Sequence, residues 1–307
     1  MMNYQLRVRE LTVAEILGKS FKIYFSQFEI FLAPFLLSSF ANTAIREIIM
    51  TLLPPFNLPE SLSEGFFLYL IDYLSIAIPV FSAFLMISWV INTLSSGIAT
   101  ACSYDVIEGR IPNLKTSLAF ILSKIWPLLA VGFITGVLTV IGFILLIIPG
   151  VLVAIMFSLS IQIATIEQVS ATLSLQRSKK LVADRWGKVF AILLSTSLII
   201  AVMYVIGSAV GKIIGVSNTL VKGLIESVFV SLAQPLQPLS MTCLYHSLRM
   251  KEIMCARREV IPPVSPPQVQ TYADGLIGFH PRFCYKCGQK LTFDAVYCPQ
   301  CGVRVRS

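Results

Sequence analysis

Six long apolar stretches are the feature that most constrains how this 307-residue chain can fold. They cover approximately residues 28–51, 67–103, 126–148, 151–167, 188–212 and 220–247. A helix that crosses a bilayer needs about 20 apolar residues. The chain is 56% hydrophobic and only 13% charged, whereas about a quarter of the residues of a soluble domain are charged. The sequence therefore predicts an all-α integral membrane protein with six transmembrane helices.

The second apolar stretch, residues 67–103, is too long for one span that is perpendicular to the membrane. We interpret it as one helix that is tilted, or kinked at Pro79, and that continues into the cytosol. Two helices in this stretch are the alternative, and they would change the topology. Between the third and fourth stretches, Pro149 and Gly150 predict a helix stop and restart, so these two spans are expected to form a tight hairpin.

The basic residues predict the orientation of the chain in the membrane. With both termini in the cytosol, the cytosolic segments hold sixteen basic residues before the C-terminal tail, and the opposite side holds three, Arg46, Lys212 and Lys222. Short loops on the cytosolic side of membrane proteins carry an excess of lysine and arginine. We therefore expect a multi-pass protein of the cell membrane with cytosolic N- and C-termini.

Short amphipathic stretches precede the first, third and fifth spans. The first begins at a Thr12-x-x-Glu15 capping box, the second follows Asn113, and the third, weaker one lies around Leu173 and Trp186. Such helices lie in the membrane interface when one face is apolar and the other is basic. They suggest three loosely repeated units, each an interfacial helix followed by a helical hairpin. The alternative is that any basic cytosolic loop gives this pattern.

Composition divides the chain into three segments. We assign residues 1–258 to the helical transmembrane domain and residues 282–307 to a C-terminal module. Between them, residues 259–281 are rich in proline and are predicted to be an extended linker.

Four cysteines in the C-terminal module form two Cys-x-x-Cys-Gly knuckles, Cys284/Cys287 before Gly288 and Cys298/Cys301 before Gly302. Four thiolates bind Zn²⁺ tetrahedrally, and the glycine turns the chain back after each knuckle. The reducing cytosol disfavours disulfides between such pairs. We predict a small β zinc ribbon with one structural Zn²⁺ and no open coordination position for catalysis. Cys102, Cys243 and Cys255 are interpreted as reduced, buried thiols.

Ionisable and amide side chains within the spans are candidate functional residues. Arg46 and Asp72 lie at similar predicted depths in the first two spans and could line a polar cavity with Glu47. The simpler alternative is that these side chains reach the nearby interface.

The sixth span contains Gln234-Pro235-Leu236-Gln237-Pro238 at mid-membrane depth, so it is predicted to be a broken helix. Broken helices build transporter sites, although they also occur as kinks in packed bundles. Gln234 and Gln237 are therefore added to Arg46 and Asp72 as a candidate polar site in the membrane.

Several short motifs resemble the membrane domain that precedes some glycerophosphodiester phosphodiesterases and that also stands alone in many prokaryotic membrane proteins. They are Leu146–Gly150, Glu167, Leu175–Ser178, Leu181, Trp186, Leu244–Tyr245 and Leu248–Arg249. The resemblance covers most of residues 10–255 and implies a cytosolic motif of Glu167, Arg177, Ser178, Tyr245 and Arg249. The chain departs from the family at His246 and Ser247, where the family tends to place an acidic residue. The knuckles separately resemble zinc ribbons of archaeal and bacterial membrane proteins.

No catalytic residues are predicted. The chain has two histidines, His246 and His280, and neither has a carboxylate at ligand spacing. We expect a non-catalytic membrane scaffold in the lipid bilayer whose zinc ribbon recruits a protein partner. A transporter or channel for a small or lipid-like solute is the alternative, and an enzyme of lipid chemistry would rest on fold analogy alone. Nucleic acid is not the expected partner, and a homo-oligomer is a lesser alternative.

Overall fold

The computed structural model describes residues 10–53, 64–260, 283–284, 286–291 and 296–304, with the backbone alone for residues 64–66 and 255–260. The chain forms two compact units, Met1–Ala256 and Arg257–Ser307, which we call the helical unit and the cysteine unit. The last helix ends at Val260, so the first two residues of the predicted linker are helical. The remainder of that linker, residues 261–281, lies outside the described residues.

Eleven helices follow one another along the described part of the chain. They are α1 (Val13–Ser26), α2 (Phe28–Leu52), α3 (Glu64–Ile107), α4 (Leu114–Ser123), α5 (Ile125–Leu145), α6 (Ile147–Met156), α7 (Ser160–Glu167), α8 (Ala171–Val182), α9 (Trp186–Ile213), α10 (Thr219–Ala233) and α11 (Leu236–Val260). Six helical segments are long and apolar enough to cross a membrane: α2, α3, α5, α6 with α7, α9, and α10 with α11. The predicted all-α fold with six such segments is confirmed.

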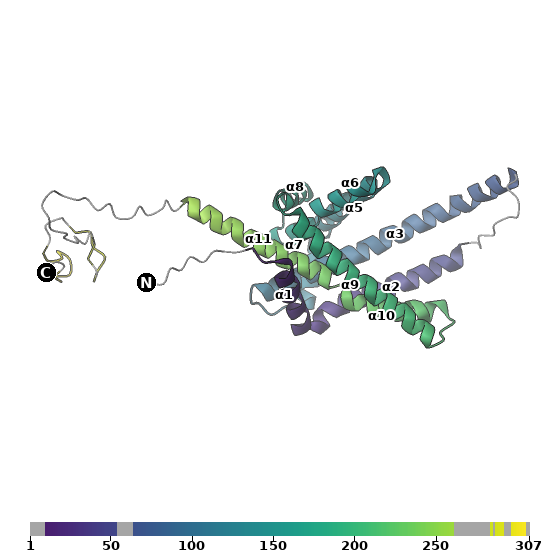
Figure 1. Ribbon diagram of the computed structural model, residues 1–307, viewed down its shortest axis with the longest axis horizontal. Coiled ribbons are helices and arrows are strands. Elements are labelled where there is room, and N and C mark those ends of the chain that lie inside the picture. The colour runs from purple at the N-terminus through teal and green to yellow at the C-terminus, as the bar shows by residue number, and fades with distance from the viewer. Residues whose placement is uncertain (1–9, 54–63, 261–282, 285, 292–295, 305–307) are drawn as a thin grey trace. The chain divides into compact units, whose positions relative to one another are not determined.

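The second apolar stretch is a single helix (Figure 1). The helix α3 has 44 residues and contains Pro79 without a break. At about 1.5 Å per residue it is about 66 Å long, roughly twice the ~30 Å thickness of a hydrocarbon core. A helix of this length extends well beyond the bilayer core.

The tight turn between α5 and α6 is made by Leu146, whose backbone is extended (φ −168°, ψ 153°). The sequence placed this stop at Pro149 and Gly150, three residues later. Both instead lie in the first turn of α6, where a proline is tolerated because its missing N–H would have no helical partner. A Cβ on Gly142 would lie 2.8 Å from the Cα of Gly150, so the two backbones touch and the hairpin requires both glycines.

The fourth span is broken between α6 and α7. A serine from another helix forms hydrogen bonds with the backbone groups at the break. The Ser178 hydroxyl, on α8, donates to the Met156 carbonyl (2.9 Å) and accepts from the Leu159 N–H (3.3 Å). Ser178 is completely buried. Its single hydroxyl therefore pairs two backbone groups that the break leaves without helical partners.

We expect Ser178→Ala to lower the free energy of unfolding by about 2 kcal/mol, because both backbone groups would be buried without a partner. Unfolding of the purified protein in mixed micelles measures this change. The control is Ser123→Ala, an exposed serine that donates only to the Phe120 carbonyl in its own helix. An equal loss in the two variants would contradict this role of Ser178.

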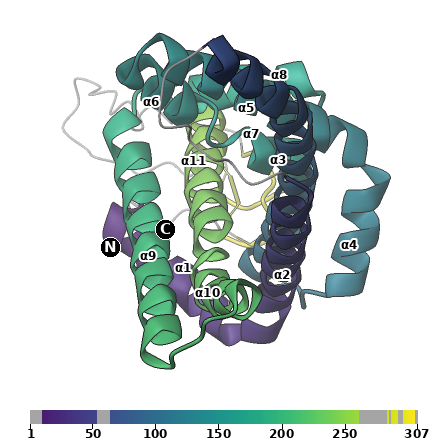
Figure 2. The same ribbon diagram turned by 90° about the vertical axis from the view of Figure 1, so that its right-hand side faces the viewer.

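The core of the helical unit is built around the first half of α11. Figure 2 shows α11 in the middle of this unit, between α9 and α3. Leu239, Leu244 and Tyr245 of α11 are 0–1% exposed, and Ile16, Phe31 and Ile192 from other helices join the same core. The position of α11 explains why its residues 236–248 combine apolar and small polar side chains, since neighbouring helices cover them.

Three short helices, α1, α4 and α8, precede the first, third and fifth spans, as the sequence predicted. Thr12 and Glu15 form the predicted capping box at α1. The Asn113 side chain accepts from the backbone N–H groups of Lys115 and Thr116 and caps α4. Whether these helices lie in the membrane interface stays a prediction.

Candidate functional site

The four knuckle cysteines lie together in the cysteine unit. All four Sγ atoms lie within 4.8 Å of one another. The pairs Cys284/Cys301 and Cys287/Cys298 each have an Sγ–Sγ distance of 3.6 Å, and all four thiols are free of disulfide bonds. A tetrahedron with metal–sulfur bonds of ~2.3 Å has edges of about 3.8 Å. The cluster therefore has the size that a tetrahedral metal ion requires.

The two knuckles have the same backbone arrangement. In each one, the N–H of the first cysteine donates to a carbonyl five residues later, and the glycine N–H donates back to that cysteine (2.8–2.9 Å). Gly288 and Gly302 have φ of 73° and 69°, a conformation that glycine adopts without steric penalty. The repeated Cys-x-x-Cys-Gly pattern thus produces two equivalent turns that converge on one point.

The predicted β structure is present only in part. Two isolated antiparallel bridges, Phe283 with Lys290 and Tyr297 with Arg304, flank the two knuckles. The described residues of this unit form no strand longer than one bridge. The four cysteines can hold a metal ion.

In the helical unit, the residues of the predicted cytosolic motif meet where α7, α8 and α11 pack. The Tyr245 hydroxyl of α11 donates to the Glu167 carboxylate at the end of α7. Arg177 of α8 pairs with the same Glu167 oxygen (3.0 Å) and with Glu252 of α11 (3.3 Å). Glu167 is 11% exposed, and Tyr245 is completely buried. We call these residues the Glu167 network, which joins three helices through one carboxylate.

Arg249 and Ser178 do not bond to this network. Arg249 instead donates to the Tyr104 hydroxyl of α3 (3.2 Å), and Ser178 bonds to the α6–α7 break described above. His246 lies 3.8 Å from Glu108, the residue that follows α3. Through Arg249 and His246, α11 therefore contacts the C-terminal end of α3.

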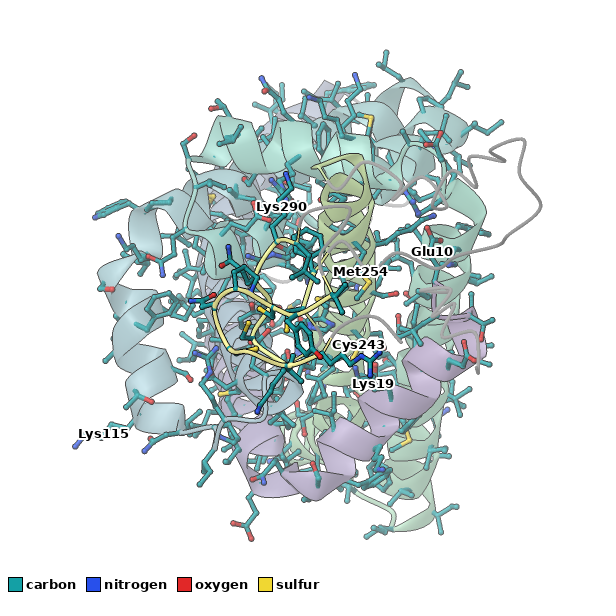
Figure 3. All side chains as sticks on the ribbon, turned by 90° about the vertical axis from the view of Figure 1, so that its left-hand side faces the viewer. Glu10, Lys19, Lys115, Cys243, Met254 and Lys290 are labelled. Carbon is teal, nitrogen blue, oxygen red and sulfur yellow. The ribbon has the colours of Figure 1, made fainter. Side chains whose placement is uncertain are left out.

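A second ionic cluster is built on Glu10, a residue that no motif of the sequence selects (Figure 3). Its carboxylate pairs with Arg185 (2.7 Å), Lys188 (3.0 Å) and Lys251 (2.9 Å). Hydrogen bonds from Arg185, followed by those from Lys251 and Lys188, hold the pKa of Glu10 far below its ordinary value, although burial opposes this shift. The Glu10 cluster joins the N-terminal segment to the start of α9 and to α11.

This lowered pKa predicts how stability depends on pH. Glu10 binds a proton more weakly in the folded protein than in the unfolded chain. Its contribution to stability is therefore complete above the ordinary pKa of 4.5 and declines as the pH falls below that value. We expect Glu10→Gln to lower the free energy of unfolding by about 2 kcal/mol near neutral pH. The difference from the wild-type protein should shrink below pH 4.5. Unfolding in mixed micelles across this range measures it.

Glu29→Gln is the matched control, because Glu29 is exposed at the start of α2. It should change stability little at any pH. A difference between Glu10→Gln and the wild-type protein that stays constant down to the acid limit would show that the carboxylate charge is not the cause.

The candidate polar residues of the membrane have different partners in the described part of the chain. Arg46 pairs with Glu47 (3.1 Å), and the described residues show no ion pair between Arg46 and Asp72. The Gln234 side chain accepts from the Ser39 hydroxyl of α2 (3.2 Å). Gln237 is partly buried in the first turn of α11. The bond between Ser39 and Gln234 shows that α2 contacts the break in the sixth span.

One buried carboxylate in the sixth span was missed. Glu226 of α10 is 9% exposed, and a Cβ on Gly207 of α9 would lie 3.1 Å from its Cα. It forms no ion pair with another described residue. A carboxylate within a predicted span is itself the signal that would have found it.

Taken together, the helices and the cysteines define an all-α protein with six segments able to cross a membrane and a separate unit able to hold a metal ion. No family model matches the chain, and neither a curated protein nor a solved structure matches it. The resemblance to the phosphodiesterase-associated membrane domain stays a prediction.

Proposed function

We propose that this chain is a non-catalytic membrane scaffold whose cytosolic C-terminal unit binds one structural Zn²⁺ and recruits a protein partner. The observation that carries the proposal is the cluster of four cysteine Sγ atoms within 4.8 Å of one another. Four thiolates fill every position of a tetrahedral ion, so no position is left for water or substrate. Zinc suits such a sulfur site, and a closed site is structural rather than catalytic.

The distribution of charge supports a cytosolic location for the cysteine unit. Arg177 lies on α8, Arg185 immediately precedes α9 and Lys251 lies in the second half of α11. The Glu167 network and the Glu10 cluster join these three helices. Basic residues concentrated at one end of a membrane bundle favour the cytosolic side. Reduced thiols are also maintained there.

Two exposed aromatic side chains support a protein partner. Phe283 and Tyr297 occupy equivalent bridge positions in the two knuckles and are 59% and 60% exposed. Aromatic residues are enriched at the centres of protein interfaces. A Zn(Cys)₄ centre adds about two negative charges, which offset the nearby lysines and weaken the case for nucleic acid.

The test captures partners from an extract of the source cells with the full-length chain in nanodiscs. The wild-type protein is compared with the double variant Phe283→Ser, Tyr297→Ser, which keeps all four cysteines. We expect one or a few proteins to bind the wild-type chain and to be lost from the double variant at unchanged zinc content. The proposal fails if the two chains capture the same proteins, or if capture disappears after nuclease treatment.

A transporter is the second candidate, and buried Glu226 in the sixth span is the observation that favours it. Against it, Gln234 bonds to Ser39, and Thr43 bonds to Ser227 (2.5 Å), so α2 contacts the polar groups beside the break. Liposome flux assays with the double variant Pro235→Ala, Pro238→Ala and with Glu226→Gln distinguish the two candidates. A scaffold keeps its fold and its partner in these variants, whereas a transporter loses flux.

A further inference from the structure

A cavity of about 120 Å³ opens between α4, the start of α5 and the end of α7. Its lining is mostly apolar, including Phe120, Leu128 and Val169, and also contains Lys124, Thr165 and Ser170. Its volume accommodates several water molecules, and therefore a phosphate group, but not a whole lipid. Neither the four cysteines nor the two ionic clusters contribute to it.

The cavity lies at the level where a span enters the membrane. Lys124 immediately precedes α5, the third predicted span. The next residue but one, Trp126, is 79% exposed in the first turn of that helix. Exposed tryptophans and basic side chains at the ends of spans mark the layer of lipid headgroups. A lipid phosphate in this layer would be within reach of the cavity.

One residue of the cavity lining, Thr165, has a buried hydroxyl without a partner. Thr165 is 7% exposed, and its hydroxyl forms no hydrogen bond with any described residue. A threonine in a helix can bond to a carbonyl of its own preceding turn, and Thr165 does not. A buried hydroxyl without a partner is destabilising by about 1–3 kcal/mol, so a bound group that supplies an acceptor would remove this penalty.

The start of α8 adds a second source of positive potential. Ser170, its N-cap residue, lines the cavity and makes no side-chain capping hydrogen bond. The first N–H groups of a helix have no partners within the helix and attract anions. Lys124 is the only charged residue in the lining, so the cavity combines one cation with a helix N-terminus and contains no carboxylate.

We propose that this cavity binds the phosphate of an anionic phospholipid, with Lys124 pairing with the phosphate and Thr165 donating a hydrogen bond to it. The apolar part of the lining accommodates the glycerol and the first carbons of the chains, which extend into the bilayer. This apolar lining is why we assign the site to a lipid and not to free phosphate. The inference is independent of zinc binding and of partner recruitment.

The test measures binding of short-chain phosphatidylglycerol to the purified full-length chain in detergent, by native mass spectrometry and thermal shift. We expect Lys124→Gln and Thr165→Val each to weaken this binding about tenfold, which corresponds to about 1.4 kcal/mol. Thr165→Ser keeps the hydroxyl and should keep the affinity. Lys115→Gln removes the same charge from the outer side of α4, where Lys115 points away from the bundle (Figure 3), and should have no effect.

Three further results would overturn the proposal. The first is equal binding of phosphatidylcholine, because its headgroup carries no net charge. The second is binding of inorganic phosphate as tight as that of phosphatidylglycerol, which would indicate a free-anion site. The third is an equal loss of binding in Lys115→Gln, which would indicate non-specific attraction to a basic surface.

Discussion

Replacing Cys298 by serine should reduce bound zinc from one ion per chain to none. Cys298 is buried in the cluster, and its Sγ lies 3.6 Å from that of Cys287. A serine hydroxyl is not deprotonated at neutral pH and binds zinc far more weakly than a thiolate does. Elemental analysis of the purified full-length protein measures the metal content directly.

Cys243→Ser is the matched control for zinc loss, because Cys243 is a free, buried cysteine in the helical unit. It should leave the zinc content unchanged. Zinc that survives in Cys298→Ser, or a wild-type protein that holds iron instead, would contradict the assigned centre.

A large loss of folding stability is expected from Glu167→Ala. This change removes the acceptor of the completely buried Tyr245 hydroxyl and one of the two acidic partners of Arg177. We expect the free energy of unfolding to fall by about 3 kcal/mol, because a buried polar group and a partly buried charge lose their partner together. Unfolding in mixed micelles measures the loss.

A double-mutant cycle separates the Glu167 network from a general loss of packing. Tyr245→Phe should be destabilising in the wild-type background and nearly neutral in Glu167→Ala, with a coupling energy of about 1 kcal/mol or more. The matched control is Glu252→Ala. Glu252 is 51% exposed, so its removal should change stability by less than about 1 kcal/mol. Additive effects of Glu167→Ala and Tyr245→Phe would show that the two residues do not act together.

Hydropathy predicted the six membrane segments because their apolar length is a local property of the chain. The capping box at Thr12 and the convergence of the cysteines could also be predicted from the sequence, since both depend on residue types at fixed short spacing. The break between α6 and α7 could not be predicted. Residues 157–159 contain neither proline nor glycine. The Met156 carbonyl and the Leu159 N–H at the break are paired by Ser178, a partner that only the tertiary structure reveals.

The ionic clusters could not be predicted from local sequence either. Glu10 is one acidic residue in a polar N-terminal segment, and its three cationic partners follow it by 175, 178 and 241 residues. No local pattern selects it. Glu167 and Arg177 are close in sequence, and the motif implied by the resemblance contains both. The contribution of Tyr245 to the same carboxylate depends on how α11 packs against α7.

The Glu10 cluster also determines an order of events during biosynthesis. Glu10 precedes all six membrane segments and is therefore synthesised before them, whereas Lys251 lies at the end of the last segment and is synthesised after the other five. The cluster therefore cannot be completed until every span has been translated and inserted. A chain that stops before α11 leaves Glu10 with Arg185 and Lys188 but without Lys251.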